Sequence, residues 1–218
     1  LTDGHASYAF YDENTAGRML SETDLPVLGD DVQAVFFGGI SLVVEPCAAT
    51  YEALMRREAA RRVTMIDPNI RPGFIKNEAA YRQRIGRMLQ LADIVKLSDE
   101  DLAWLAGHND AEAGVRDVLN EGARLVCITR GSEGVTGYTD AGSVTVAARR
   151  VEVVDTVGAG DTFNAGLLAA LQDAGALTKR AVAALDDDTI RAALDLGVRA
   201  AAVTVSRAGA NPPTRAEL

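Results

Sequence analysis

The sequence is short of the features that place a protein in a membrane, in an oxidising compartment or on nucleic acid. Its 218 residues contain no apolar run of about 18 residues, so no segment is predicted to span a bilayer, and no signal peptide is visible. Cys47 and Cys127 stand alone in apolar segments without metal-ligand spacing, which predicts buried free thiols and a cytoplasmic location. Lysine and arginine (22) are outnumbered by aspartate and glutamate (31), and the net charge of −9 argues against nucleic acid or an anionic membrane as partner.

The chain also lacks internal repeats, low-complexity tracts and flexible linkers. Its length suffices for one large core, and its 48% hydrophobic and 24% charged residues are ordinary for a soluble globular protein. Strand-like and helix-like patterns alternate over residues 32–130, and a short antiparallel run precedes two long helices. This order predicts an α/β sandwich with a largely parallel sheet. Strands are expected at residues 6–12, 33–37, 63–66, 94–97, 124–129, 135–139, 143–147 and 151–154.

A glycine-rich turn that opens a helix is the most informative stretch. Gly158, Ala159 and Gly160 lead directly into Asp161, and apolar residues follow at helical spacing. The unpaired N–H groups and the positive dipole end of such a helix make a site for an anion such as phosphate, which small side chains let approach the backbone. Asp161 is placed to accept a proton from a hydroxyl that attacks a phosphoryl group. The alternative is that Asp161 only caps the helix and the glycines only turn the chain.

Residues 155–161 (Asp-Thr-Val-Gly-Ala-Gly-Asp), followed by Ala165-Gly166, resemble the C-terminal signature of the ribokinase-like (pfkB-type) carbohydrate kinases. The resemblance is greatest to the bacterial fructokinase branch of that family. It implies the ribokinase-like sandwich with a small β lid, and ATP-dependent transfer of the γ-phosphoryl group to a primary hydroxyl of a monosaccharide with Mg²⁺. It also implies that Asp161 is the catalytic base and that the amides of Gly158, Ala159 and Gly160 stabilise the developing charge. A non-catalytic nucleotide- or sugar-binding module with the same fold is the alternative.

Members of this family carry an additional opening segment with a Gly-Gly-Asn sugar-binding motif and an aspartate that grips sugar hydroxyls. Neither occurs here, and the chain starts at Leu1 rather than Met. We therefore expect a fragment, or a sequence whose earlier residues are not included. Residues 1–30 are expected to form part of the lid and its connector, and residues 31–218 the α/β kinase core. The resemblance further implies a homodimer formed through the lid.

The resemblance places Phe10, Tyr11 and Asp12 in or near the sugar pocket. The related 2-keto-3-deoxygluconate kinases have an arginine where Asp12 stands, and Asp12 would repel a carboxylate. A neutral sugar is therefore expected, with fructose first and 2-keto-3-deoxygluconate as the alternative. Asn69 and Arg71 lie in residues 67–72, which resemble the Asp-Pro-Asn-x-Arg-Pro loop of the fructokinase branch. Asn69 and Arg71 are expected to face the transferred phosphate or the sugar. The alternative is that Phe10, Tyr11, Asp12, Asn69 and Arg71 are ordinary strand and surface residues.

The remaining resemblances concern the nucleotide and cations. The residues assigned to ATP are Thr129, Gly131, Gly134, Gly158, Gly160 and Asn164. Ser98 and Asp101 replace the Asn and Glu of a family motif, so Asp101 is expected to organise Mg²⁺ through water, or otherwise to be an acid at a helix start. Asp155, with the loop at residues 206–213, is expected to hold a monovalent cation such as K⁺.

Overall fold

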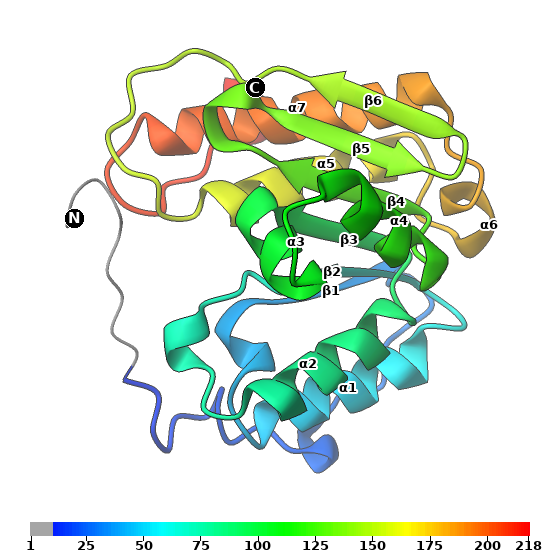
Figure 1. Cartoon of the computed structure of the whole chain (residues 1–218), viewed down its shortest axis with the longest axis vertical. Coiled ribbons are helices and arrows are strands. Elements are labelled where there is room, and N and C mark those ends of the chain that lie inside the picture. The colour runs from blue at the N-terminus through cyan, green and yellow to red at the C-terminus, as the bar shows by residue number, and fades with distance from the viewer. Residues whose placement is uncertain (1–10) are drawn as a thin grey trace.

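A single mixed sheet forms the centre of the computed structural model, which describes residues 11–218 (Figure 1). Its strands are β1 (Ala34–Gly38), β2 (Val63–Asp67), β3 (Ile94–Ser98), β4 (Leu125–Thr129), β5 (Val135–Thr139) and β6 (Gly142–Val146). They lie in the order β1-β2-β3-β4-β5-β6. Strands β1 to β4 are parallel to one another, and β5 and β6 continue the sheet as an antiparallel hairpin. The predicted largely parallel sheet is therefore confirmed.

The register of the parallel strands makes them end at one edge of the sheet. Gly38 pairs with Asp67 across β1 and β2, and Ser98 pairs with Thr129 across β3 and β4. The loops that follow these strands therefore gather at that edge. Strands β2 to β4 are almost continuously apolar and buried, as strands covered on both faces must be.

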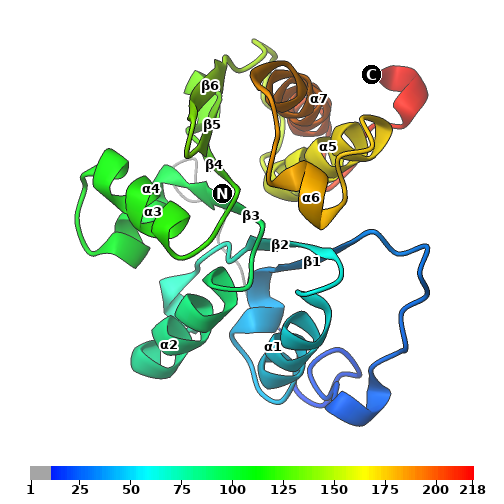
Figure 2. The same ribbon diagram turned by 90° about the vertical axis from the view of Figure 1, so that its right-hand side faces the viewer.

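Helices cover the sheet on both faces (Figure 2). One face carries α1 (Cys47–Glu58), α2 (Glu78–Leu89), α3 (Asp99–Ala106) and α4 (Ala111–Asn120), and the other carries α5 (Ala159–Asp173), α6 (Lys179–Val182) and α7 (Asp187–Val205). Short 3₁₀ helices occur at Glu22–Asp24, Gly39–Leu42, Pro72–Phe74, Gly131–Glu133 and Arg215–Glu217. Each face has its own apolar core. Of the helices in residues 11–218, none combines the length and hydropathy that a membrane crossing requires.

Helices α5 and α7 pack closely because glycines face each other across their contact. A Cβ atom added to Gly166 would lie 2.8 Å from the Cα of Gly197. A Cβ atom added to Gly197 would lie 2.7 Å from the ring of Phe163. The small residues at this contact therefore let the last helix approach its neighbour.

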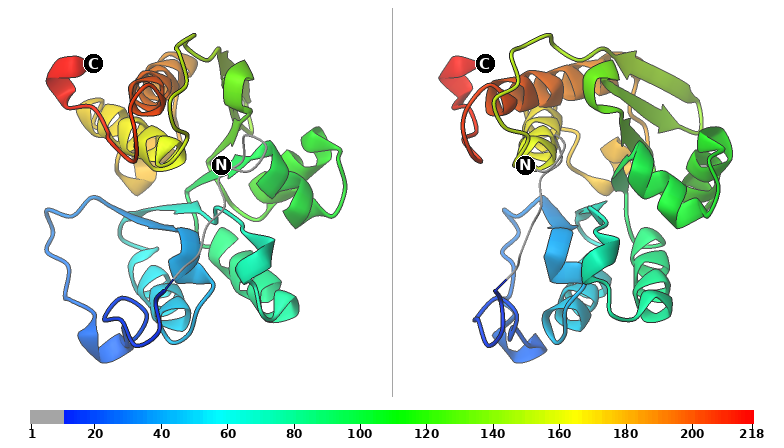
Figure 3. Two further views of the ribbon diagram at one scale, coloured as in Figure 1. Left: turned by 90° about the vertical axis from the view of Figure 1, so that its left-hand side faces the viewer. Right: turned by 60° about the vertical axis from the view of Figure 1, so that its left-hand side comes forward.

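One predicted strand is wrong: residues 151–154 are irregular. The backbone N–H groups of Val154 and Asp155 both donate to the carbonyl oxygen of Val205, at the end of α7, at 2.8 and 3.2 Å. This segment is therefore joined to a helix end instead of a sheet, within the long loop between β6 and α5 (Figure 3). Of the strand expected at 6–12, residues 6–10 lie outside the described residues, and Tyr11 and Asp12 are not in a strand. The lid at residues 1–30 and the homodimer stay predictions.

Candidate active site

The turn that opens α5 has a backbone that only glycine adopts easily. Gly158 has φ +80° and is the N-cap of α5, and a Cβ atom there would lie 3.1 Å from the Cβ of Ala210. The carbonyl oxygen of Gly158 accepts hydrogen bonds from the backbone N–H and the hydroxyl of Thr162, at 2.9 and 2.8 Å. These bonds set the first turn of the helix. The N–H group of Ala159 donates to the carbonyl oxygen of Thr156 at 3.3 Å. The other N–H groups at the start of α5 have no partner within the helix and can face an anion.

A cavity of about 660 Å³ lies beside this turn. It brings together residues that the sequence assigned to the nucleotide from two distant segments, with Thr129, Gly131 and Gly134 at and just after the end of β4 and Gly160 at the start of α5. Ala159 also lines it. Its other walls are largely apolar and come from α7 and the loop after β6, including Val151, Val153, Val198, Ala201 and Val205. The cavity therefore combines a glycine-rich polar end with an apolar remainder.

Gly134 shows why this turn needs glycine. Its φ is +105°, and a Cβ atom there would lie 2.2 Å from the carbonyl oxygen of Val146. The turn is closed by the backbone N–H of Arg130, which donates to the carbonyl oxygen of Gly134 at 2.8 Å. The guanidinium of Arg130 points to the sheet instead, where it donates to Thr136 and Tyr138. Gly131, Ser132 and Gly134 of this turn line the cavity.

Asp161 is exposed in the first turn of α5, one residue beyond the cavity-lining Gly160. The structure thus places a carboxylate in solvent beside the helix N-terminus and makes it no part of the helix cap, because Gly158 is the N-cap. Its role as a base stays a prediction.

Asp155 connects the loop before α5 to the C-terminal segment. Its two carboxylate oxygens accept the backbone N–H groups of Val157 at 3.0 Å and Gly209 at 2.9 Å. These two hydrogen bonds hold the pKa of Asp155 below its ordinary value. The carboxylate therefore stays ionised and ties residues 206–211 to the start of α5. Binding of a monovalent cation there stays a prediction.

Asp101 fastens the loop after β2 to the start of α3. One carboxylate oxygen accepts the backbone N–H of Ile70 at 2.8 Å, and the other accepts that of Ser98 at 3.1 Å. The side chain is buried, and Ser98 in turn accepts the N–H of Asp101, which completes a capping box. Both oxygens thus have structural partners, which favours the interpretation as an acid at a helix start, and the Mg²⁺ role stays a prediction.

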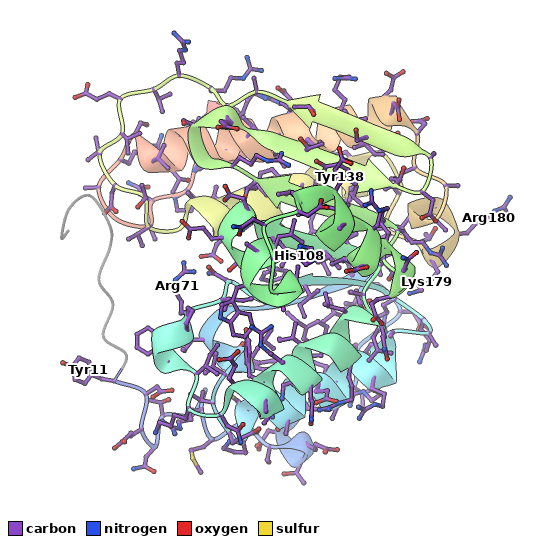
Figure 4. All side chains as sticks on the ribbon, viewed as in Figure 1. Tyr11, Arg71, His108, Tyr138, Lys179 and Arg180 are labelled. Atoms are coloured by element: carbon purple, nitrogen blue, oxygen red, sulfur yellow. The ribbon has the colours of Figure 1, made fainter. Side chains whose placement is uncertain are left out.

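Asn69 and Arg71 lie in that same loop at the carboxyl edge of the sheet (Figure 4). Asn69 has φ +46°, and its backbone N–H donates to Asp67 at 3.2 Å. Arg71 is exposed, and its guanidinium donates to the carbonyl oxygen of Ile70 at 2.9 Å. Neither lines the cavity beside α5, and contact with sugar or phosphate stays a prediction.

Tyr11 and Asp12 lie at a second cavity, of about 700 Å³, which shares no lining residue with the first. Tyr11 is 92% exposed and projects away from the fold (Figure 4). The carboxylate of Asp12 pairs with Arg18 at 3.0 Å. Asp12 is therefore not the lone negative charge that the argument against an acidic sugar assumed. Phe10 lies outside the described residues.

Sequence reasoning missed a buried polar cluster beneath the start of α5. The ammonium of Lys96 lies 3.1 Å from the carboxylate of Asp67, and the two side chains are 6% and 2% exposed. The amide of Asn164, which the sequence assigned to the nucleotide, donates to the same carboxylate at 2.8 Å and is itself buried. A direct contact of Asn164 with the nucleotide is therefore not supported by this geometry. The signal available in the sequence was a lysine inside an otherwise apolar strand.

Burial raises the pKa of Asp67, and the nearby positive charge of Lys96 opposes that rise. Among residues 11–218, no group of three or more His, Cys, Asp or Glu side chains is placed to hold a metal ion.

Comparison with known proteins gives consistent results. Residues 9–217 match the model of the pfkB family carbohydrate kinases. The chain is 58% identical over 191 residues to a fructokinase of Rhizobium leguminosarum bv. trifolii, a match that covers 88% of this chain and 59% of the relative. It is 31% identical over 215 residues to the probable fructokinase-7 of Arabidopsis thaliana, covering 96% of this chain and 61% of the relative. The chain thus spans about three fifths of the length of these relatives.

Solved structures agree in fold. The fructokinase of Xylella fastidiosa with bound ATP superimposes with a TM-score of 0.84 at 28% identity, covering 95% of this chain and 66% of that one. The fructokinase of Vibrio cholerae O395 in its fructose-, ADP- and calcium-bound form gives a TM-score of 0.78 at 26% identity, covering 90% of this chain and 62% of that one.

Proposed function

Because the chain belongs to the pfkB family of carbohydrate kinases, we propose that it is the larger part of a sugar kinase that transfers the γ-phosphoryl group of ATP to fructose. The observation that carries this proposal is the turn at Gly158–Gly160, which opens α5 beside a cavity and presents the exposed Asp161. A protein that only binds nucleotide needs the turn but has no need of a carboxylate at that position. Asp161 therefore favours a kinase over a binding module.

In the proposed reaction, Asp161 accepts the proton of a primary hydroxyl of the sugar as the hydroxyl oxygen attacks the γ-phosphorus. A new oxygen–phosphorus bond forms, the bond to the bridging oxygen breaks, and ADP leaves. The backbone N–H groups of Gly158, Ala159 and Gly160 face the negative charge that builds on the transferred group. The dipole of the fifteen-residue helix α5 adds to their effect.

The cavity beside α5 is proposed to hold the nucleotide. Its volume of about 660 Å³ lies within the range of about 300–1,000 Å³ typical of small-molecule sites. The apolar walls from α7 suit the adenine base, and the turn at Gly131–Gly134 allows phosphates or ribose to approach the backbone. The names of the similar structures support this, since they record bound ATP or ADP.

Two cations are proposed to accompany the reaction. Mg²⁺ commonly binds through substrate phosphates with only one or two carboxylates, which fits a chain whose described residues offer no ready-made carboxylate cage. Asp155 still has lone pairs beyond the two that accept backbone N–H groups, so it can contribute to a K⁺ site with carbonyls of residues 206–211. A similar fructokinase variant from V. cholerae is described with potassium bound.

The identity of the sugar depends mainly on the relatives. Fructose is favoured because a relative at 58% identity is named fructokinase. The charge argument from Asp12 is weaker, because Arg18 pairs with it. The alternative, 2-keto-3-deoxygluconate, would gain from the exposed guanidinium of Arg71, a group that can bind a carboxylate with two hydrogen bonds.

The test is an ADP-release assay on the full-length protein with Mg-ATP and fructose, in which Asp161→Ala is compared with Asp187→Ala. Asp187 is also an exposed acid in the first turn of a long helix, α7, but lies outside the nucleotide cavity. Loss of the base should lower kcat about 10²–10⁴-fold with little change in ADP affinity, whereas the control should keep its rate. Equal rates for the two variants would reduce Asp161 to a helix-terminal acid. Absence of sugar phosphorylation by the wild type would refute the kinase assignment.

A further inference from the structure

Lys96 occupies an unusual position for a lysine. It lies in the middle of β3, and the alternation of the strand directs it to the same face as Ile94, which packs in the core beneath α5 and α7. Its side chain is 6% exposed, although lysine is rarely buried unless it is paired. Its partner is Asp67, directly opposite at the end of β2.

The ammonium group lies immediately beneath the anion-binding turn. A Cβ atom added to Gly160 would be 3.3 Å from the Nζ atom of Lys96. Gly160 itself lines the nucleotide cavity. The Lys96 charge is therefore separated from the cavity floor by little more than the backbone of one glycine, at the positive end of the α5 dipole.

The orientation of the ion pair adds to that dipole. The Oδ2 atom of Asp67, which faces Lys96, also accepts the amide of Asn164 at 2.8 Å, and its Oδ1 atom accepts the backbone N–H of Asn69 at 3.2 Å. The negative end of the pair is thus fixed at the sheet, and the positive end lies next to the turn. Burial makes such a charge more effective, because little water screens it.

The hydrogen bonds around this pair also leave a buried polar atom without a partner in the described part of the chain. The Oδ1 atom of Asn164 is buried and has no hydrogen-bond partner among the described residues. An ammonium has three N–H donors, and among the described residues the partner of Lys96 is the carboxylate of Asp67, in an ion pair. A pair that served the fold alone would be expected to have its buried polar atoms satisfied, because an unsatisfied buried group costs stability.

We propose that Lys96 is a positioning residue for phosphoryl transfer, whose positive charge acts through the turn at Gly158–Gly160 to favour the negative charge that builds on the transferred group. The proposal rests on the kinase function proposed above. Lys96 keeps its proton throughout, and Asp161 remains the group that takes the proton of the sugar. The competing account is that Lys96 only neutralises Asp67.

A double-substitution experiment separates the two accounts. Lys96→Met removes the charge and keeps an unbranched side chain only one heavy atom shorter, and Asp67→Asn removes the opposite charge. The proposal expects Lys96→Met to lower kcat about 10- to 100-fold with little change in KM for the sugar. It also expects the double variant to be at least 10-fold slower than Asp67→Asn alone. If the double variant matches Asp67→Asn, Lys96 only neutralises its partner and the proposal is wrong.

Lys179→Met is the matched control. Lys179 also pairs with a buried aspartate, Asp93, at 2.6 Å, but it lies at the opposite end of the sheet from Arg71 (Figure 4). Its kcat should remain that of the wild type. If Lys179→Met lowered kcat as much as Lys96→Met does, the loss would come from breaking a lysine–aspartate pair and not from the position of Lys96. That result would overturn the proposal. If Lys96→Met fails to fold, the uncharged double variant still gives the deciding comparison with Asp67→Asn.

A binding measurement makes the result independent of the sugar. Mg-ADP with fluoroaluminate mimics the phosphoryl group in transit, and its affinity can be compared with that of Mg-ADP alone by calorimetry. Lys96→Met should weaken the mimic about 10- to 100-fold and ADP less than about threefold. Equal weakening of both ligands would overturn the proposal. A wild type that binds the mimic but phosphorylates no sugar would refute the proposed function and leave the Lys96 assignment to the anion site standing.

Discussion

The close contact between α5 and α7 gives a prediction that can be worked out from the structure alone. In Gly166→Ala the new methyl group would lie 2.8 Å from the Cα of Gly197 and 2.9 Å from the carbonyl oxygen of Leu196. Both atoms belong to the backbone of α7, so no side-chain rotation can relieve the overlap. The two helices would have to move apart, and the packing between them would loosen.

Two effects of opposite sign determine the size of the change. Alanine is a better helix former than glycine by about 1 kcal/mol, which favours the variant. Overpacking of a well-packed contact typically costs about 1–3 kcal/mol, and a backbone obstacle places this contact at the upper end. We expect the free energy of unfolding to fall by about 1–2 kcal/mol.

Gly86→Ala isolates the helix-propensity effect. Gly86 lies within α2, and a Cβ atom there would have no neighbour within 4 Å. This control should gain about 0.5–1 kcal/mol, so that the two variants differ by about 1.5–3 kcal/mol. Urea unfolding followed by circular dichroism measures both values. If Gly166→Ala proved as stable as Gly86→Ala, the contact between the helices would be looser than described and the reasoning would be refuted.

Three further predictions concern the site. Gly134→Ala, whose methyl group would lie 2.2 Å from the carbonyl oxygen of Val146, should weaken ADP binding by about 10-fold or more in a titration, and unchanged affinity would contradict the cavity assignment. Backbone N–H donors lower the pKa of Asp155 from 3.8, so its ionised form adds stability above about pH 4 that is lost as the pH falls through the lowered pKa. The difference in unfolding free energy between the wild type and Asp155→Asn should therefore shrink on acidification, and a constant difference would argue against this role. The full-length enzyme should have a higher kcat/KM for fructose than for 2-keto-3-deoxygluconate, and the reverse preference would favour the alternative substrate.

The sequence predicted those elements whose signal is local. The apolar runs at 63–66 and 94–97 indicated buried strands, and the structure places β2 and β3 there. The glycine-rich turn before an apolar stripe predicted the start of α5, because a left-handed residue such as Gly158 and the helical spacing after it are both properties of neighbouring residues. The family resemblance depends on the same local motif, and a contiguous motif can be recognised from the order of its residues alone.

Other features depended on residues far apart in the chain. Residues 151–154 alternate like a strand, but the N–H groups of Val154 and Asp155 donate to the carbonyl oxygen of Val205, about fifty residues further on. Asp12 has the charge that the sequence argument required, yet Arg18 neutralises it. Propensity and pattern report which backbone forms are allowed, whereas the partner of a given N–H group or charge is set by packing.

The cluster beneath α5 shows the same limit most clearly. Asp67, Lys96 and Asn164 come from three elements, and nothing in their local sequence says that they touch. The sequence determined that a lysine would stand in an apolar strand, where burial without a partner is unfavourable. Only the alignment of β2 with β3, and the packing of α5 over both, decided that its partner is Asp67 and that its charge lies under Gly160. The reason is physical: a buried charge requires a nearby opposite charge, and distance in space is fixed by the tertiary fold alone.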